Sequence, residues 1–352
     1  MFLALKEMRK EKLRYSLIIA MIVLISYLIF ILTSLALGLA QQNTAAINSW
    51  GIQSIILDKD ANRSLSASMI DKADAPKSLP TSQAYIGHAA IVAKHSGHTQ
   101  VSGTFIGLDN SQFVAKRLDL TSGHLAQTDH QLVVDDAFKD AGYKLGDTFA
   151  LNGQDQAYKI VGFTHNAKMS VAPVVYGRLG AWTGLKNAPT AMQASAIVST
   201  KADPKAPAKQ LHTYSKDAFI QKLPGYSAQN MTFEMMIGFL MVISLIVIAV
   251  FLYILTMQKR QNYAVLRAQG IPGSVLVKST LSQALLMVVA GLVIGTILTA
   301  ATAIAMPAAV PMAFSVPALA LVALALIVIA MLGAVIPVRS VLRVDPVSVI
   351  GG

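Results

Sequence analysis

Three long runs of this sequence carry no charged residue, and they constrain the fold more than any other feature. The runs are 16–40, 235–257 and 279–338, and each is mostly apolar. A helix that crosses a membrane needs about 20 apolar residues, so each of the first two runs predicts one span. The third is about three times that length and carries Pro307 and Pro311 near its middle, so it predicts two spans joined by a short turn.

The composition agrees with a membrane protein, since 54% of the residues are hydrophobic and 13% are charged, against about 25% charged in soluble domains. The run 16–40 could instead be the apolar core of a secretion signal, because basic residues precede it and small residues end it. Such a core measures about 7–15 residues. The run is longer than that, and we expect it to be retained as a span.

Basic residues flank the spans unevenly and set the predicted orientation. They gather before the first span, between the second and third, and after the last: Lys6, Arg9, Lys10, Lys12, Arg14, Lys259, Arg260, Arg267, Lys278, Arg339 and Arg343. Because loops rich in Lys and Arg stay cytoplasmic, both termini are predicted inside and residues 41–230 outside. The same topology accounts for the net charge of +11, so we expect no nucleic-acid partner.

Residues 41–230 predict a folded α+β domain. Runs typical of strands are QSIILD, AAIVAK, VSGTFIGL, HQLVVDD, DTFALN, AYKIVGFT and SAIVST, and runs typical of short helices are DDAFKDAGY and KDAFIQKL. Apolar and polar residues alternate in TFALN and YKIVGF, which favours a mixed or antiparallel sheet. The predicted fold class is a membrane protein with four transmembrane α-helices and an extracytoplasmic α+β domain inserted between helices 1 and 2.

The predicted segments follow in order along the chain. They are a cytoplasmic amphipathic helix on the lipid surface (1–14), transmembrane helix 1 (15–40), the extracytoplasmic domain (41–230), transmembrane helix 2 (231–257), a cytoplasmic coupling segment (258–278), transmembrane helix 3 (279–306), a short outer turn (307–317), transmembrane helix 4 (318–338) and a cytoplasmic tail (339–352).

Residues that could carry catalysis are few, and we predict no enzyme and no catalytic residue. All seven histidines fall in the extracytoplasmic segment, and the pair His95 and His98 has no third ligand at a fixed spacing. The sequence has no G-x-S-x-G or H-E-x-x-H motif. GSVLVKST has Val277 where a phosphate-binding loop needs glycine before its lysine, so we expect no nucleotide site.

Glu234, at the outer end of the second span, is one of only three glutamates in the chain. An acid at such a place costs free energy unless it is solvated, paired or used. Met231 and Met235 share a helical face with it if the helix starts early enough. The pattern leaves two interpretations open, a water-facing interface residue or part of a ligand site.

The segment 258–278 predicts a short helix over 263–268, a left-handed cap at Gly270 and a turn at Pro272, followed by a return to the membrane. A short helix on the inner face of a membrane protein suits docking to a cytosolic partner.

YAVLRAQGIPGSVLVKSTLSQALL resembles the E-x-A-x-L-[RK]-A-x-G segment of MacB/FtsX-type ABC transporter permeases, with Tyr263 where the family usually has glutamate. FLALKEMRKEKLRYSLIIAMIVLISYLIF, TSGHLAQTDHQLVVDDAFKDAGYKLGDTFALNGQDQAYKIVGFT and IPVRSVLRVDPVSVIGG are similar to the family's first span, outer block and closing element. The overall build most resembles the haem-exporter permeases of the HrtB group.

The resemblance implies the permease subunit of an ABC efflux transporter that works by mechanotransmission. It implies a homodimer in a bacterial plasma membrane with two cytosolic ATPase subunits, which bind ATP, and no cofactor of its own. Coupling to the ATPase is then expected at Tyr263, Leu266, Arg267, Ala268 and Gly270.

Haem is the cargo that the resemblance implies. The expected haem-binding residues are Glu234, Met231, Met235 and Phe233, with Glu234 and Met231 as candidate ligands of the haem iron, which takes oxygen or thioether ligands. Two alternatives stay open: a permease for another amphipathic cargo (an antimicrobial peptide, a lipid or a lipoprotein), or a non-transporting member that regulates a cell-wall hydrolase.

Overall fold

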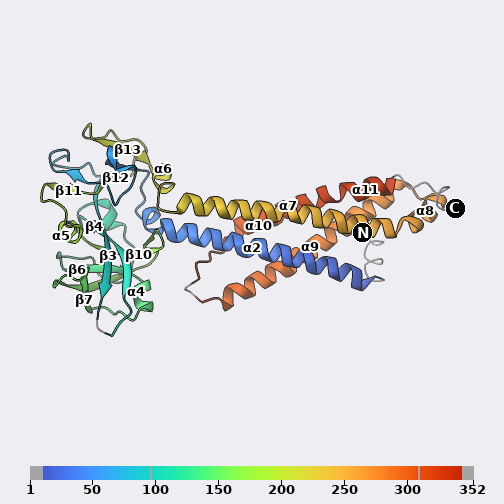
Figure 1. Cartoon of the computed structure of the whole chain (residues 1–352), viewed down its shortest axis with the longest axis horizontal. Helices are drawn as coiled ribbons and strands as arrows, with labels where there is room; N and C mark the ends of the chain where they lie inside the picture. The colour runs from blue at the N-terminus through green and yellow to red at the C-terminus, as the bar shows by residue number, and fades with distance from the viewer. Residues whose placement is uncertain (1–10, 96, 308–309, 343–352) are drawn as a thin grey trace. The chain divides into compact units, whose positions relative to one another are not determined.

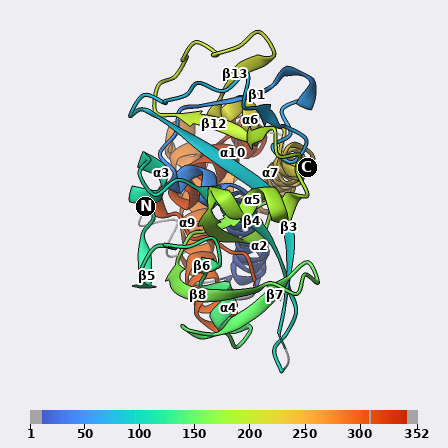
Figure 2. The same cartoon turned by 90° about the vertical axis from the view of Figure 1, so that its left-hand side faces the viewer.

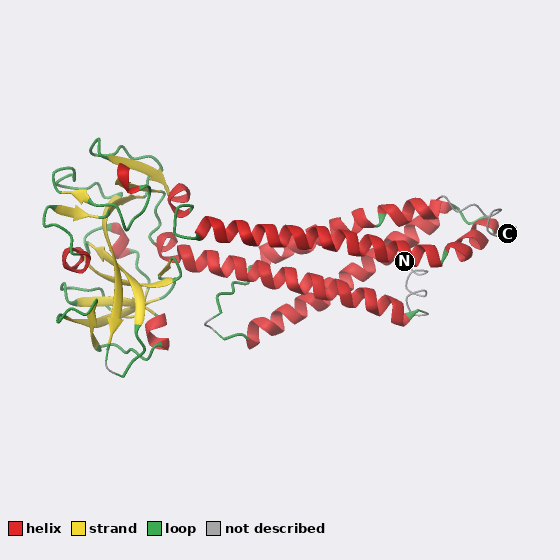
Figure 3. Ribbon diagram, viewed as in Figure 1, coloured by secondary structure: helices red, strands yellow, loops and turns green. Residues whose placement is uncertain are grey.

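The computed structural model describes residues 11–95, 97–307 and 310–342, and the chain divides into two units (Figure 1). The span unit comprises residues 1–38 and 230–352, and the inserted domain comprises residues 39–229. In Figure 3 the strands are confined to the inserted domain, while the span unit is helical. Each unit is described by itself below.

Four helices of the described chain are long and apolar enough to cross a membrane, which confirms the predicted number of spans. They are α2 (Lys12–Ser49), α7 (Tyr226–Gln258), α9 (Gly273–Ala305) and α10 (Val316–Gly333). Helix α11 (Val335–Leu342) follows α10 after one residue. The predicted amphipathic helix 1–14 and the tail 339–352 fall largely outside the described residues.

All four long helices contribute to the main apolar core of the span unit. Its buried members include Ile22 and Ile29 of α2, Leu252 of α7, Val288 of α9 and Leu326 of α10. Apolar side chains pack here at van der Waals distance, and this packing is the main term that can hold helices together in lipid.

The connection between α9 and α10 returns along α2. The backbone N–H of Ala313 donates to the Ser34 carbonyl at 2.9 Å, and Gly38 has no side chain where the backbone of Pro311 passes. Helix α10 begins with Pro317 in its first turn, where proline's missing N–H costs nothing. Residues 311–313 of the predicted outer turn therefore pack against the first span.

The inserted domain contains a mixed sheet of 11 strands (Figure 2). The strands are β1 (Ser54–Asp58), β3 (Gln83–Lys94), β4 (Val101–Leu108), β5 (Leu120–Gly123), β6 (Gln131–Asp135), β7 (Thr148–Leu151), β8 (Ala157–Thr164), β9 (Lys168–Met169), β10 (Ala172–Arg178), β12 (Ala196–Ser199) and β13 (Leu211–Ser215). The path runs β13-β1-β12-β3-β4-β10-β6-β8-β5, with β7 on β3 and β8, and β9 on β10. Only the β10–β4 and β6–β8 pairs are parallel among those described.

A small second sheet pairs β2 (Ile70–Asp71) with β11 (Met192–Ala194). Short helices fill the connections: η1 (Lys59–Ala61), α3 (Phe113–Lys116), α4 (Ala137–Asp140), α5 (Leu179–Lys186) and α6 (Lys216–Ile220). Every strand and helix run predicted from the sequence of this domain is present, which confirms the α+β fold class.

The last turns of α2 belong to the core of the inserted domain. Ala46, Ile47 and Trp50 are fully buried there. The Trp50 indole N–H donates to the Tyr176 hydroxyl at 3.2 Å, and Arg117 donates to the Gly51 carbonyl at 3.0 Å, which satisfies a carbonyl just past the helix end. Burial raises the pKa of Tyr176 to about 12. These contacts join the end of α2 to the core of the inserted domain.

Candidate functional site

The first turns of α7 place three of the four expected haem-binding residues on one exposed face. Because α7 begins at Tyr226, Met231, Glu234 and Met235 are all helical and stand at i, i+3 and i+4. Met231 is 60% exposed and Met235 55% exposed, and Glu234 is exposed as well. Phe233 is half-buried and lies on another side of the helix. The face therefore offers a carboxylate and two thioethers.

This face continues along α7 as a stripe of exposed apolar side chains. Its members are Met231, Met235, Phe239, Val242, Ile246, Val250, Tyr253 and Met257. Helix α7 has the smallest buried share of the four spans in its most apolar stretch, 17% against 39% in α2 and in α9. Much of its surface is thus left for lipid or for another protein chain.

The predicted coupling segment forms helix α8 (Arg260–Ala268), which ends in a Schellman motif. Gly270 has φ +86°, as the predicted left-handed cap requires. The Ile271 N–H donates to the Leu266 carbonyl at 3.1 Å, and the Gly270 N–H donates to the Arg267 carbonyl at 3.0 Å. The cap reverses the chain into α9 within a few residues.

The expected coupling residues fall on two sides of α8. Tyr263 is buried against Leu276 of α9, and Leu266 is half-buried in the same cluster. Arg267 donates to the Leu342 carbonyl at 3.3 Å. Ala268 and Gly270 are exposed. Tyr263 and Leu266 thus hold α8 against α9.

Sequence reasoning missed three members of the exposed face of α8, namely Gln261, Asn262 and Val265. This face also carries Ala268 and Gln269, and Val265 is 47% exposed. The helical period is the signal that could have found Val265, because it places Val265 on the side of α8 that faces away from Tyr263, Ala264 and Leu266.

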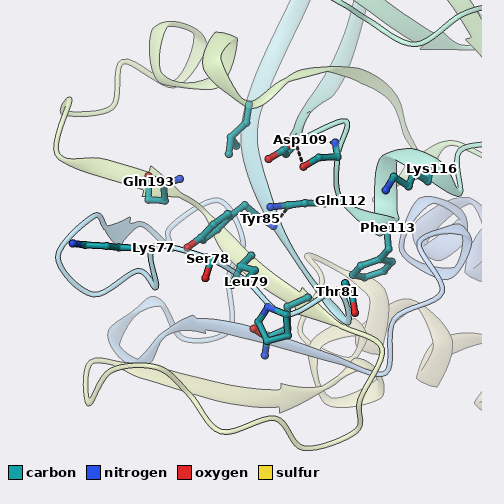
Figure 4. Close-up of a pocket in the computed structure, with 14 residues that line it drawn as sticks. Lys77, Ser78, Leu79, Thr81, Tyr85, Asp109, Gln112, Phe113, Lys116 and Gln193 are labelled. Carbon is teal, nitrogen blue, oxygen red and sulfur yellow. Dashed lines mark hydrogen bonds between the residues drawn. The ribbon is translucent and has the colours of Figure 1, made fainter.

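A cavity of about 450 Å³ opens on the inserted domain (Figure 4). Tyr85 of β3 lies at its floor, and the Gln112 side-chain oxygen accepts a hydrogen bond from the Tyr85 N–H at 2.7 Å. Lys77 and Lys116 line it together with Asp109, whose carboxylate accepts from Ser111. Sequence analysis did not predict this cavity, because its lining comes from segments far apart along the chain.

The histidines of the inserted domain do not assemble into a metal site within the described residues, which contain no group of three or more His, Asp or Glu side chains that could hold an ion. The rings of His95 and His98 lie 4.8 Å apart, and His98 stacks on Tyr143 at the same distance. These rings form an aromatic stack at the end of the β3–β4 hairpin.

The fold and these surfaces define a multi-pass membrane protein with a globular domain between its first two spans. Residues 234–346 match the FtsX-like permease C-terminal family. This match confirms the resemblance to MacB/FtsX-type ABC transporter permeases that the sequence segments predicted.

Curated relatives match the chain over its full length. The putative hemin transport system permease protein HrtB of Staphylococcus haemolyticus is 24% identical over 356 residues, which covers 100% of this chain and 99% of the relative. The protein of the same name from Staphylococcus epidermidis is 23% identical over 353 residues, with the same coverage.

Among solved structures, the periplasmic region of MacB from Actinobacillus actinomycetemcomitans is similar with a TM-score of 0.36 and 16% identity, over 49% of this chain and 93% of that one. The extracellular domain of the noncanonic ABC-type transporter YknZ from Gram-positive bacteria is similar with a TM-score of 0.31 and 12% identity, over 42% of this chain and 81% of that one.

Proposed function

We propose that this permease exports haem from the membrane and that it works as a homodimer with two cytosolic ATPase subunits. The main support for haem as the cargo is the exposed face of α7, where Glu234 lies beside Met231 and Met235. The names of the full-length relatives, which refer to hemin transport, support the same cargo.

Haem suits this face because its macrocycle is flat and apolar while its iron accepts oxygen or sulfur ligands. Glu234 and Met231 are the ligands that we propose for the iron, and Met235 supplies an adaptable apolar contact. Phe233 lies off this face in one chain, so its proposed contact with haem depends on the second copy or on movement of the helix.

A second copy of the chain would complete the site. In a twofold dimer each residue near the axis appears twice, so paired α7 helices would present two carboxylates and two sets of thioethers to one ligand. The exposed apolar stripe of α7 is the surface that we propose for this pairing. Haem would then be held between two equivalent faces near the extracytoplasmic surface of the plasma membrane.

The ATPase contact is proposed at α8, on the cytoplasmic side that the distribution of Lys and Arg predicts. Gln261, Asn262, Val265, Ala268 and Gln269 form the exposed face available for docking, while Tyr263 and Leu266 keep the helix in place. ATP binding in the partner would move α8, then the spans, and so the inserted domain outside. This sequence of movements is the proposed mechanotransmission.

A growth experiment tests the cargo. Cells that produce the permease with its ATPase are expected to tolerate haemin, and Glu234→Ala is expected to abolish that tolerance. Met231→Ala should weaken it. Met236→Ala serves as the matched control, because Met236 is also exposed but lies two residues from Glu234 on another side of α7.

Unchanged haemin tolerance in Glu234→Ala cells with normal protein levels would refute the proposed site. If the parent gives no haemin tolerance but protects against an antimicrobial peptide, the cargo belongs to the alternative amphipathic class. Capture of a cell-wall hydrolase by the inserted domain, with no export, would instead support the regulatory alternative.

A further inference from the structure

A buried chain of hydrogen bonds joins three helices of the span unit. The Lys259 ammonium nitrogen lies 2.7 Å from the Tyr15 hydroxyl oxygen, to which it donates. The Tyr15 hydroxyl in turn donates to the side-chain oxygen of Gln283 at 3.0 Å. Lys259, Tyr15 and Gln283 are only 6%, 2% and 4% exposed. We call this set the Lys259–Tyr15–Gln283 chain.

The Lys259–Tyr15–Gln283 chain is significant because of where Lys259 lies in the fold. Helix α7 ends at Gln258 and α8 begins at Arg260, so Lys259 is the single residue between them. Its carbonyl accepts the first hydrogen bond of α8, from the Tyr263 N–H at 2.9 Å. The backbone of Lys259 is thus the junction of α7 with α8, while its side chain reaches Tyr15 of α2.

Energetics explain why such a contact holds one geometry. Burying an ammonium group costs free energy unless its N–H groups are hydrogen-bonded. Hydrogen bonds to a charged group are stronger than those between neutral groups. Rotation of α8 about its junction with α7 would have to stretch the bond from Lys259 to Tyr15 or carry Tyr15 with it. Because the Tyr15 hydroxyl is also hydrogen-bonded to Gln283, a displacement of Tyr15 would also displace α9.

We propose that the Lys259–Tyr15–Gln283 chain is the positioning contact that passes movement of α8 to spans α2 and α9. The inference rests on the proposed docking of an ATPase at α8. It adds the residues through which that docking acts on the spans, and none of them touches the cargo face of α7. Tyr15 is its central member, since it bonds to both of the others.

Tyr15→Phe tests this inference because it removes only the hydroxyl group. The matched control is Tyr27→Phe, since the Tyr27 hydroxyl also joins α2 to α9, through Thr302 at 2.8 Å, but three turns farther along α2. The full-length permease is placed in vesicles with its ATPase, and haemin exported per ATP hydrolysed is measured. We expect this ratio to fall about tenfold in Tyr15→Phe, a typical size for coupling between two sites, and to stay unchanged in Tyr27→Phe.

A second readout does not depend on the cargo. The chain has no cysteine, so Leu24→Cys in α2, an exposed position, takes a single environment-sensitive fluorophore. We expect ATP to change its emission in the parent and in Tyr27→Phe, and to have no effect in Tyr15→Phe or Gln283→Leu. Thermal unfolding of each variant is followed as a check on folding.

Three results would overturn the inference. The first is an unchanged response of the label to ATP in Tyr15→Phe. The second is an equal loss of this response in Tyr15→Phe and Tyr27→Phe. The third is a loss of the response in Tyr15→Phe that follows a fall in its thermal stability, which would show that the hydrogen bond is purely structural. If ATP changes the label's emission in the parent but the parent exports no haemin, the proposal of haem as the cargo is contradicted. The label readings of the variants then still decide the role of Tyr15.

Discussion

Gly295 of α9 lies directly against Ser26 of α2, and a methyl group added to Gly295 would stand 2.5 Å from the Ser26 hydroxyl oxygen. One turn earlier in the sequence, Gly291 faces Ile22 at the same short distance. Small residues four apart let two membrane helices approach closely. This approach fixes the register of α2 against α9, and with it the Tyr15–Gln283 and Tyr27–Thr302 bonds.

Gly295→Val is therefore expected to destabilise the span unit by about 1–3 kcal/mol, the usual cost of overpacking a close contact. Ala300→Val on the same helix is the control, because Ala300 is exposed. Thermal unfolding in detergent compares the two variants. Equal midpoints would mean that Gly295 is not needed for the approach of the helices.

His88 of β3 gives the inserted domain a predicted sensitivity to acid. Its Nδ1 is buried and has no hydrogen-bond partner in the described structure. Burial, and then the charge of Lys186, lowers the pKa of His88 from 6.5 to about 4. Between these values the unfolded domain binds more protons than the folded one, so the free energy of unfolding falls as the pH drops from about 6.5 towards 4.

The loss attributable to His88 is about 3 kcal/mol over that pH range. Both tryptophans, Trp50 and Trp182, are buried in the inserted domain, so tryptophan fluorescence reports its unfolding alone. We expect His88→Gln to flatten the pH dependence, while His130→Gln, at an exposed position, keeps it. A parent and a His88→Gln variant with the same pH dependence would contradict the assignment.

Val265→Asp is expected to separate docking of the ATPase from the packing of α8. Val265 is exposed, whereas Leu266 packs with Tyr263 and Leu276. A charge at Val265 should weaken binding of the ATPase without changing the thermal stability of the permease. Leu266→Asp should lower both, because it also breaks the apolar cluster.

Co-purification of the ATPase with each variant, beside thermal unfolding, checks this expectation. Full ATPase recovery with Val265→Asp would place the docking surface elsewhere.

Much of the fold could be predicted because its signals are local. Charge-free runs mark the spans, and Gly270 marks the cap of α8, since few other residues adopt φ +86°. Short strands such as β9 and β13 were missed, because their sequences KM and LHTYS carry no apolar alternation and they form by pairing with β10 and β1.

The candidate sites were less predictable because they depend on contacts between distant residues. Glu234 and Met231 could be paired from helical spacing alone, but the inward position of Leu266 depends on Leu276 of α9. The Lys259–Tyr15–Gln283 chain joins residues up to 268 positions apart. In the sequence, Lys259 is one of several basic residues at the ends of the spans, and only the packed structure shows that its side chain is buried.

Titration of the purified full-length permease with haemin, followed by absorption spectroscopy, tests the central claim most directly. We predict a saturable shift of the haem absorption band in the parent and in Met236→Ala. Glu234→Ala should bind at least about tenfold more weakly, the loss expected when one charged ligand worth about 1.4 kcal/mol or more is removed. Haemin binding by Glu234→Ala with the affinity and spectrum of the parent would contradict the account.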